Sequence, residues 1–147
     1  MGTHGPRRMA REAALQVLFA ADLSGQDVDR DRVRDSFDSV AGEFDLPKRA
    51  RERALELCLG VVHHLKDIDL AIAGASEHWK IERLAAVERS VLRIATFELL
   101  FEPETPAEVV IDEAVEVARR FASEKSPAFV NGVLDVVARH ARGGAGG

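Results

Sequence analysis

The stretch LAAVERSVLRIATFELLF, residues 84–101, is the most apolar part of the chain and decides the fold. Apolar residues occupy most sides of a helix drawn through it, and few charged positions interrupt them. A helix that is apolar almost all round lies in the middle of a bundle, where other helices cover it. The stretch therefore predicts an all-α bundle built around residues 84–101.

The rest of the chain supplies further helices for such a bundle. Apolar residues recur at helical spacings over residues 6–23, 29–44 and 47–65. A short helix is predicted over residues 67–76, and two more follow the chain-breaking prolines at 103 and 106. No segment has a convincing strand pattern. The sequence therefore predicts seven helices in one domain over residues 1–142, followed by a disordered glycine-rich tail, residues 143–147.

Several helix starts carry capping signals. Residues 105–108 (TPAE) match a capping box with proline at the first helical position. Ser126-Pro127 repeats the arrangement of a cap followed by proline. Asp67 and Asp69 are interpreted as caps at the start of the short helix.

Length and composition limit the class of protein. A chain of 147 residues fits one domain, and no apolar run approaches the roughly 18 residues that a membrane helix needs. The N-terminal segment lacks the apolar stretch of a secretory signal. A single cysteine, Cys58, suits a reducing compartment, so we expect a cytoplasmic protein.

Catalytic and metal-binding patterns are missing from the sequence. His63 and His64 are adjacent on a predicted helix and point about 100° apart, so they do not form an i, i+4 metal pair. Cys58 has no partner at zinc-ligand spacing. No glycine-rich loop precedes a helix to hold a phosphate. We therefore expect no enzyme, no metal site and no cofactor.

The charge of the chain is unevenly distributed. The net charge is −5, yet residues 1–11 contain Arg7, Arg8 and Arg11 and no acid. Cations at a helix start are unfavourable, because that end bears partial positive charge, and an anionic ligand would reverse the penalty. Three arginines alone are more simply explained by a solvated, frayed terminus.

The string FVNGVL, residues 129–134, carries two open questions. Asn-Gly is a hairpin signal, but the segment lies within a predicted helix, where Gly132 costs about 1 kcal/mol relative to alanine. Such a glycine indicates a close backbone approach or a special contact. Phe129 is either a core residue, which its spacing favours, or an exposed platform for base stacking.

An acidic block runs from residue 98 to residue 116 without a lysine or arginine. The simplest interpretation is a solvated helix face. The alternatives are a surface that repels nucleic acid or one that docks a basic protein. Residues 98–116 alone do not choose among them. The acids are Glu98, Glu102, Glu104, Glu108, Asp112, Glu113 and Glu116.

Four blocks of the chain, in order, resemble the NusB family. They are residues 7–19 (RRMAREAALQVLF), 87–99, 106–118 (PAEVVIDEAVEVA) and 126–135 (SPAFVNGVLD), of which FVNGVL is the most specific. The middle, residues 26–79, resembles the family in pattern only. The arginine run is sparser than in the family's best-known members, which suggests a lower RNA affinity and a greater dependence on the partner.

The resemblance implies a seven-helix bundle in two halves that acts in transcription antitermination or termination. Family members bind boxA RNA of ribosomal RNA leaders together with NusE, a ribosomal protein, within a complex of other Nus factors and RNA polymerase. By this likeness, the RNA-binding residues are Arg7, Arg8, Arg11, Lys125, Ser126 and Phe129. The residues implied to face NusE are Phe19, Glu82 and Glu88.

Two alternatives stay open at this point. A domain like those of the NusB family also occurs in ribosomal RNA methyltransferases, which need a further catalytic domain. The chain is otherwise a self-associating helical scaffold, in which Phe19 and the acidic block form a homodimer face.

Overall fold

The structure is a computed structural model, and it describes residues 5–22, 28–43, 45–76 and 80–143. Within these residues it contains seven α-helices, one short 3-10 helix and no strand, which confirms the all-α prediction. No helix among them is long and apolar enough to cross a membrane. The helices are α1 (Pro6–Ala21), α2 (Arg30–Ala41), α3 (Lys48–His63), α4 (Leu65–Ala75), η1 (Ile81–Arg83), α5 (Ala86–Phe101), α6 (Ala107–Phe121) and α7 (Ser126–Ala141).

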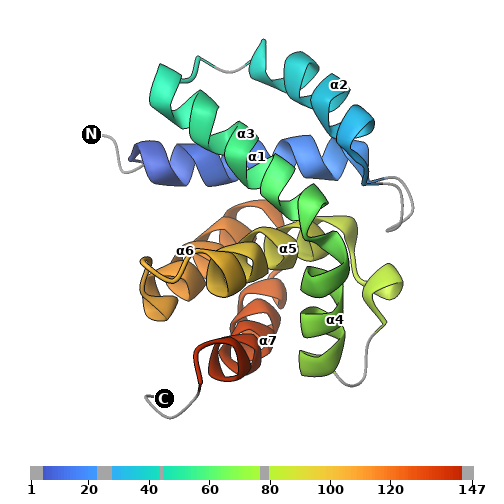
Figure 1. The fold of residues 1–147 in the computed structure, drawn as a ribbon, viewed down its shortest axis with the longest axis vertical. Helices are drawn as coiled ribbons and strands as arrows, with labels where there is room; N and C mark the ends of the chain where they lie inside the picture. The colour runs from blue at the N-terminus through green and yellow to red at the C-terminus, as the bar shows by residue number, and fades with distance from the viewer. Residues whose placement is uncertain (1–4, 23–27, 44, 77–79, 144–147) are drawn as a thin grey trace.

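The helices form two halves, with α1 to α3 above α4 to α7 in Figure 1. Helix α3 crosses α1 and leads directly into α4, so the chain passes from one half to the other at His64. Helix α5 packs against α1, α3, α4, α6 and α7. The predicted central position of residues 84–101 is thereby confirmed, because every residue from Arg89 to Leu99 is buried.

Buried charges on α5 join the two halves. Arg89 Nε donates to Asp22 Oδ2 at 2.7 Å, at the end of α1. Arg93, only 1% exposed, donates to both carboxylate oxygens of Asp69 on α4 and also contacts Asp22 at 3.3 Å. Because an unpaired buried charge is costly, these carboxylates are what allow arginine inside the bundle.

A glycine marks the closest approach of α3 to α5. A Cβ built on Gly60 would lie 2.3 Å from Cζ of Phe97, so any larger residue displaces the ring. At Gly132, in contrast, no atom lies within 4 Å of the Cβ position. The expected close approach at Gly132 within the chain is therefore wrong, since α7 turns this position toward the surface.

The capping predictions fail at three helix starts. Pro106, predicted as the first helical residue, is instead the N-cap residue, and α6 starts at Ala107. No side-chain hydrogen bond from Thr105 caps the helix. Ser126 is the first residue inside α7, and its hydroxyl bonds elsewhere. Helix α4 starts at Leu65, two residues before the predicted start, which leaves Asp69 inside the helix to pair with Arg93. The predicted disordered tail is residues 143–147, and residues 144–147 lie outside the described ranges.

Candidate nucleic-acid interface

The start of α1 presents an open cation. Arg7 is exposed and makes no hydrogen bond or ion pair with another described residue. The N-cap residue Gly5 provides no side-chain cap, and the first turn contains no acid. The partial positive charge of the helix end therefore adds to that of Arg7, and an anion would be favoured there.

Arg8 is partly exposed but already engaged. Its Nε and Nη2 donate to the two carboxylate oxygens of Glu113 on α6, at 2.9 and 2.7 Å. These hydrogen bonds raise the pKa of Arg8. The side chains are 26% and 22% exposed, so an external anion can reach the guanidinium only in competition with Glu113.

Arg11 lies in the core. Its Nε and Nη2 donate to Glu98 at 2.9 and 2.6 Å, and the two side chains are 9% and 1% exposed. Burial by itself would lower the pKa of Arg11, but the hydrogen bonds and charge of Glu98 outweigh it and the pKa is raised. Arg11 thus joins α1 to α5, and its assignment to RNA binding stays a prediction.

The turn between α6 and α7 carries the second set of predicted RNA-binding residues. Lys125 is exposed. Ser126 is 1% exposed and its Oγ donates to the carboxylate of Glu88, at the start of α5, and lies 3.0 Å from Oγ of Ser123. Phe129 is half-buried and packs against the core, so part of its surface remains accessible. Ser126 therefore positions the turn, while Lys125 and Phe129 remain accessible from outside.

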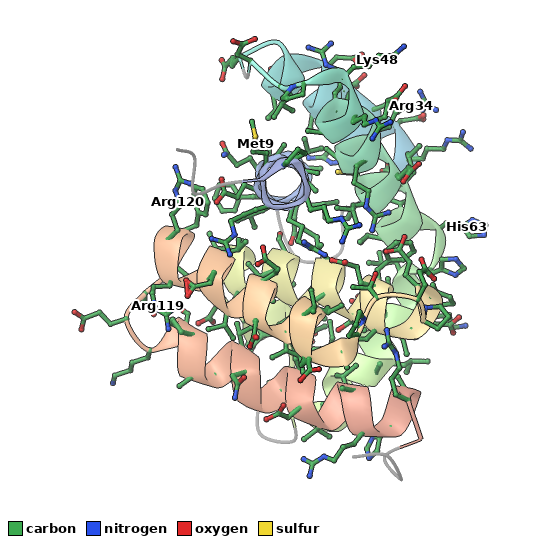
Figure 2. The ribbon with its side chains drawn as sticks, turned by 90° about the vertical axis from the view of Figure 1, so that its left-hand side faces the viewer. Met9, Arg34, Lys48, His63, Arg119 and Arg120 are labelled. Atoms are coloured by element: carbon green, nitrogen blue, oxygen red, sulfur yellow. The ribbon has the colours of Figure 1, made fainter. Side chains whose placement is uncertain are left out.

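The end of α6 connects these two sets in space. Arg120, whose side chain is 51% exposed, donates to both carboxylate oxygens of Glu12 on α1 at 3.0 Å. Met9 of α1, Arg119 and Arg120 lie on the same side of the molecule in Figure 2. Helix α1 and the turn before α7 are thus neighbours. Arg119 and Arg120 are not among the predicted site residues, although two adjacent arginines just before a predicted turn were a usable signal.

The residues predicted to face NusE lie around another junction. Arg89 bonds Asp22 at the end of α1 and the carbonyl oxygen of Ile81 in η1 at 3.2 Å. These bonds join the segments that carry the three predicted residues. Phe19 is 48% exposed on α1, Glu82 is exposed in η1, and Glu88 is half-buried in the first turn of α5.

The acidic block is divided between the interior and the surface. Glu98, Glu102 and Glu113 pair with Arg11, Arg53 and Arg8 of the N-terminal half. The hydrogen bond with Glu102 raises the pKa of Arg53. The interpretation as a uniformly solvated face is therefore wrong for these three acids. Glu104, Glu108 and Asp112 are exposed.

The cysteine and two adjacent histidines lie outside this interface. Cys58 is fully buried, and burial raises the pKa of its thiol. The ring of His64 stacks on Phe101 with 3.7 Å between the centroids, and His63 meets His64 edge-on. Across the described residues, no group of three His, Cys, Asp or Glu side chains is placed to hold a metal ion.

Comparison with known proteins identifies the family. The model of the NusB family matches residues 8–139, nearly the whole chain. The chain belongs to the NusB family. The transcription antitermination protein NusB of Desulfotalea psychrophila is 43% identical over 89% of this chain and 94% of its own. That of Geobacter sulfurreducens is also 43% identical, over 91% and 94%.

Solved NusB structures share the fold. NusB of T. maritima has a TM-score of 0.77 at 39% identity and covers 93% of each chain. A second match belongs to a crystal structure of the antitermination factors NusB and NusE in complex with dsRNA. It has a TM-score of 0.79 at 33% identity, over 92% of this chain and 97% of that one.

Proposed function

We propose that this chain is an RNA-binding transcription antitermination factor that binds boxA RNA together with NusE. The observation that carries the proposal is the full-length match to the NusB chain crystallised with NusE and dsRNA. The curated relatives agree with it, because they are named as antitermination proteins and match this chain over almost their whole length.

The RNA surface in this proposal runs from the start of α1, past the end of α6, to the start of α7. Arg7 and Lys125 are exposed cations at its two ends, and Arg120 lies between them. Their contacts with phosphates hold and orient the strand without reading its sequence. The exposed part of Phe129 gives one unpaired base a surface on which to stack, which adds selectivity for single-stranded RNA.

Arg11 and Ser126 act indirectly in this scheme. Arg11 holds α1 on α5 through Glu98, and Ser126 holds the start of α7 on Glu88. Fixing both segments before binding reduces the entropy that RNA binding must overcome.

NusE would bind beside Phe19, Glu82 and Glu88. The half-exposed aromatic ring of Phe19 supplies apolar contact, and the two acids suit a basic ribosomal protein. This chain and NusE would then each contact the same RNA weakly, and each contact would raise the effective concentration for the other. Assembly with other Nus factors and RNA polymerase, a location in the cytoplasm, and a role without catalysis belong to the same proposal.

The test is a fluorescence-anisotropy titration of labelled boxA RNA, with and without NusE, at two salt concentrations. Arg7→Ala combined with Arg8→Ala should weaken binding. It should also flatten the plot of log affinity against log salt by about 0.7 for each lost contact with single-stranded RNA.

Arg34→Ala is the matched control, because Arg34 is an exposed cation of α2 on the other side of Figure 2 from Arg119 and Arg120. It should leave affinity and slope close to those of the parent. A double variant that behaves like Arg34→Ala would remove the start of α1 from the RNA surface. A parent chain that fails to bind boxA even with NusE would refute the proposed function.

A further inference from the structure

A second cationic feature lies on the other flank of α1. A cleft of about 670 Å³ opens where the first turns of α1 and α3 meet the turn between α5 and α6. Four arginines line it: Arg7, Arg11, Arg49 and Arg53. The N-terminal end of α1 is on the left of Figure 1, so this end faces the viewer in Figure 2, where α1 is seen end-on.

Two of the four arginines form the fixed walls of the cleft. Arg11 donates twice to the buried carboxylate of Glu98. Arg53 donates to both oxygens of Glu102, with Nη1 at 2.7 Å from Oε2. A guanidinium held by two parallel hydrogen bonds has little freedom left, so these side chains are already in place before a ligand arrives.

The other two arginines have no acidic partner among the described residues. Arg7 and Arg49 are exposed, and neither has a hydrogen bond or ion pair with another described residue. Glu104 is the one lining acid that is not paired with a lining arginine. The lining therefore carries an excess of positive charge, with two guanidinium groups available to a ligand.

The backbone around the cleft increases this excess. Helices α1 and α3 both start without an acid in the first turn and without a side-chain cap. Residues Gly5 and Pro6 of the first start, and Ala50 of the second, line the cleft beside the arginines. The cationic walls and the helix ends thus favour the same kind of ligand, an anion with several acceptor oxygens.

From this arrangement we propose that the cleft binds a backbone phosphate of single-stranded RNA, beyond the segment held between Arg7 and Phe129. The inference rests on the proposed function, because Arg7 belongs both to the RNA surface and to the cleft. Exposed Lys48 adds a further positive charge at the start of α3. A strand that leaves Arg7 on this side therefore meets Arg49 and Lys48 as further cations, which suits a polyanion better than a single small ion.

The experiment compares a boxA core oligonucleotide with the same core extended by eight uridines on its 5′ or its 3′ side. Anisotropy titrations use the full chain with NusE at two salt concentrations. We expect one extension to tighten binding of the parent chain. Arg49→Gln should lose that gain, roughly fivefold, and about 0.7 of the salt slope, while binding the core as the parent does.

Arg51→Gln is the matched control, because it removes the same charge from the same turn of α3 but does not line the cleft. Replacing single phosphates of the extension by neutral methylphosphonates then locates the contact. At the contacted phosphate, the parent and Arg49→Gln should become equal, as a direct pair requires.

Three outcomes would overturn the cleft proposal: extensions that add no affinity, equal losses in Arg49→Gln and Arg51→Gln, or inorganic phosphate abolishing the gain at concentrations that leave core binding intact. The last outcome would identify a site for a free anion. Each of these leaves core binding in place, whereas failure of the proposed function is loss of core binding itself.

Discussion

Glu113 of α6 restrains Arg8, which is proposed to contact RNA, so removing the charge of Glu113 should tighten RNA binding. Arg8 and Glu113 form a two-bond ion pair whose side chains are 26% and 22% exposed. A phosphate that binds Arg8 must displace this carboxylate. Pairs at such exposure contribute up to about 1 kcal/mol, so Glu113→Gln should increase affinity by at most about fivefold.

The assay is the boxA anisotropy titration with Glu108→Gln as the matched control. Glu108 is exposed in the first turn of the same helix, and its substitution removes the same charge. The control measures the general effect of a less negative surface, and the excess in Glu113→Gln measures release of Arg8. Adding Arg8→Ala should abolish that excess. Equal affinities for Glu113→Gln and Glu108→Gln would refute the restraint.

Two further substitutions test the packing behind the interface. Phe129→Leu keeps an apolar side chain against the core but removes the aromatic face, so boxA affinity should fall by roughly fivefold or more with little change in melting temperature. Unchanged affinity with a lower melting temperature would make Phe129 a core residue only. Gly60→Ala should lower the melting temperature by several degrees, because its Cβ would overlap the ring of Phe97 at a cost of about 1–3 kcal/mol. Gly74→Ala, with open space at its Cβ, should not lower it, and equal melting temperatures in calorimetry would contradict the overlap.

The helical architecture was predictable because it depends on local pattern. The apolar residues of 84–101 required a central helix, and the structure buries them as α5. Helix starts were less predictable, because a capping pattern says which side chains can cap and not where the backbone leaves extended geometry. At Thr105 and Ser126 the pattern predicts a cap in a position that the fold uses differently.

The pairing of charges was not predictable from the sequence. Arg8 and Arg11 meet acids about a hundred positions away, and only the packing of α1 on α5 and α6 brings them together. Adjacent arginines in a sequence look equivalent, yet Arg7 is open, Arg8 is engaged at the surface and Arg11 is buried. The exposed positions Arg7 and Lys125 are therefore the stronger candidates for direct RNA contact.

The hydrogen bond between Ser126 and Glu88 joins a predicted RNA-binding turn to a predicted NusE-binding residue. A ligand that pulls the Glu88 carboxylate away from the Ser126 hydroxyl loosens the start of α7. A ligand that shifts this turn changes the position of the Glu88 carboxylate. Thermodynamic reciprocity then requires each ligand to alter the affinity of the other by the same factor, whichever arrives first. A single side-chain contact would thus make RNA and protein binding cooperative or antagonistic, without any large movement of the bundle.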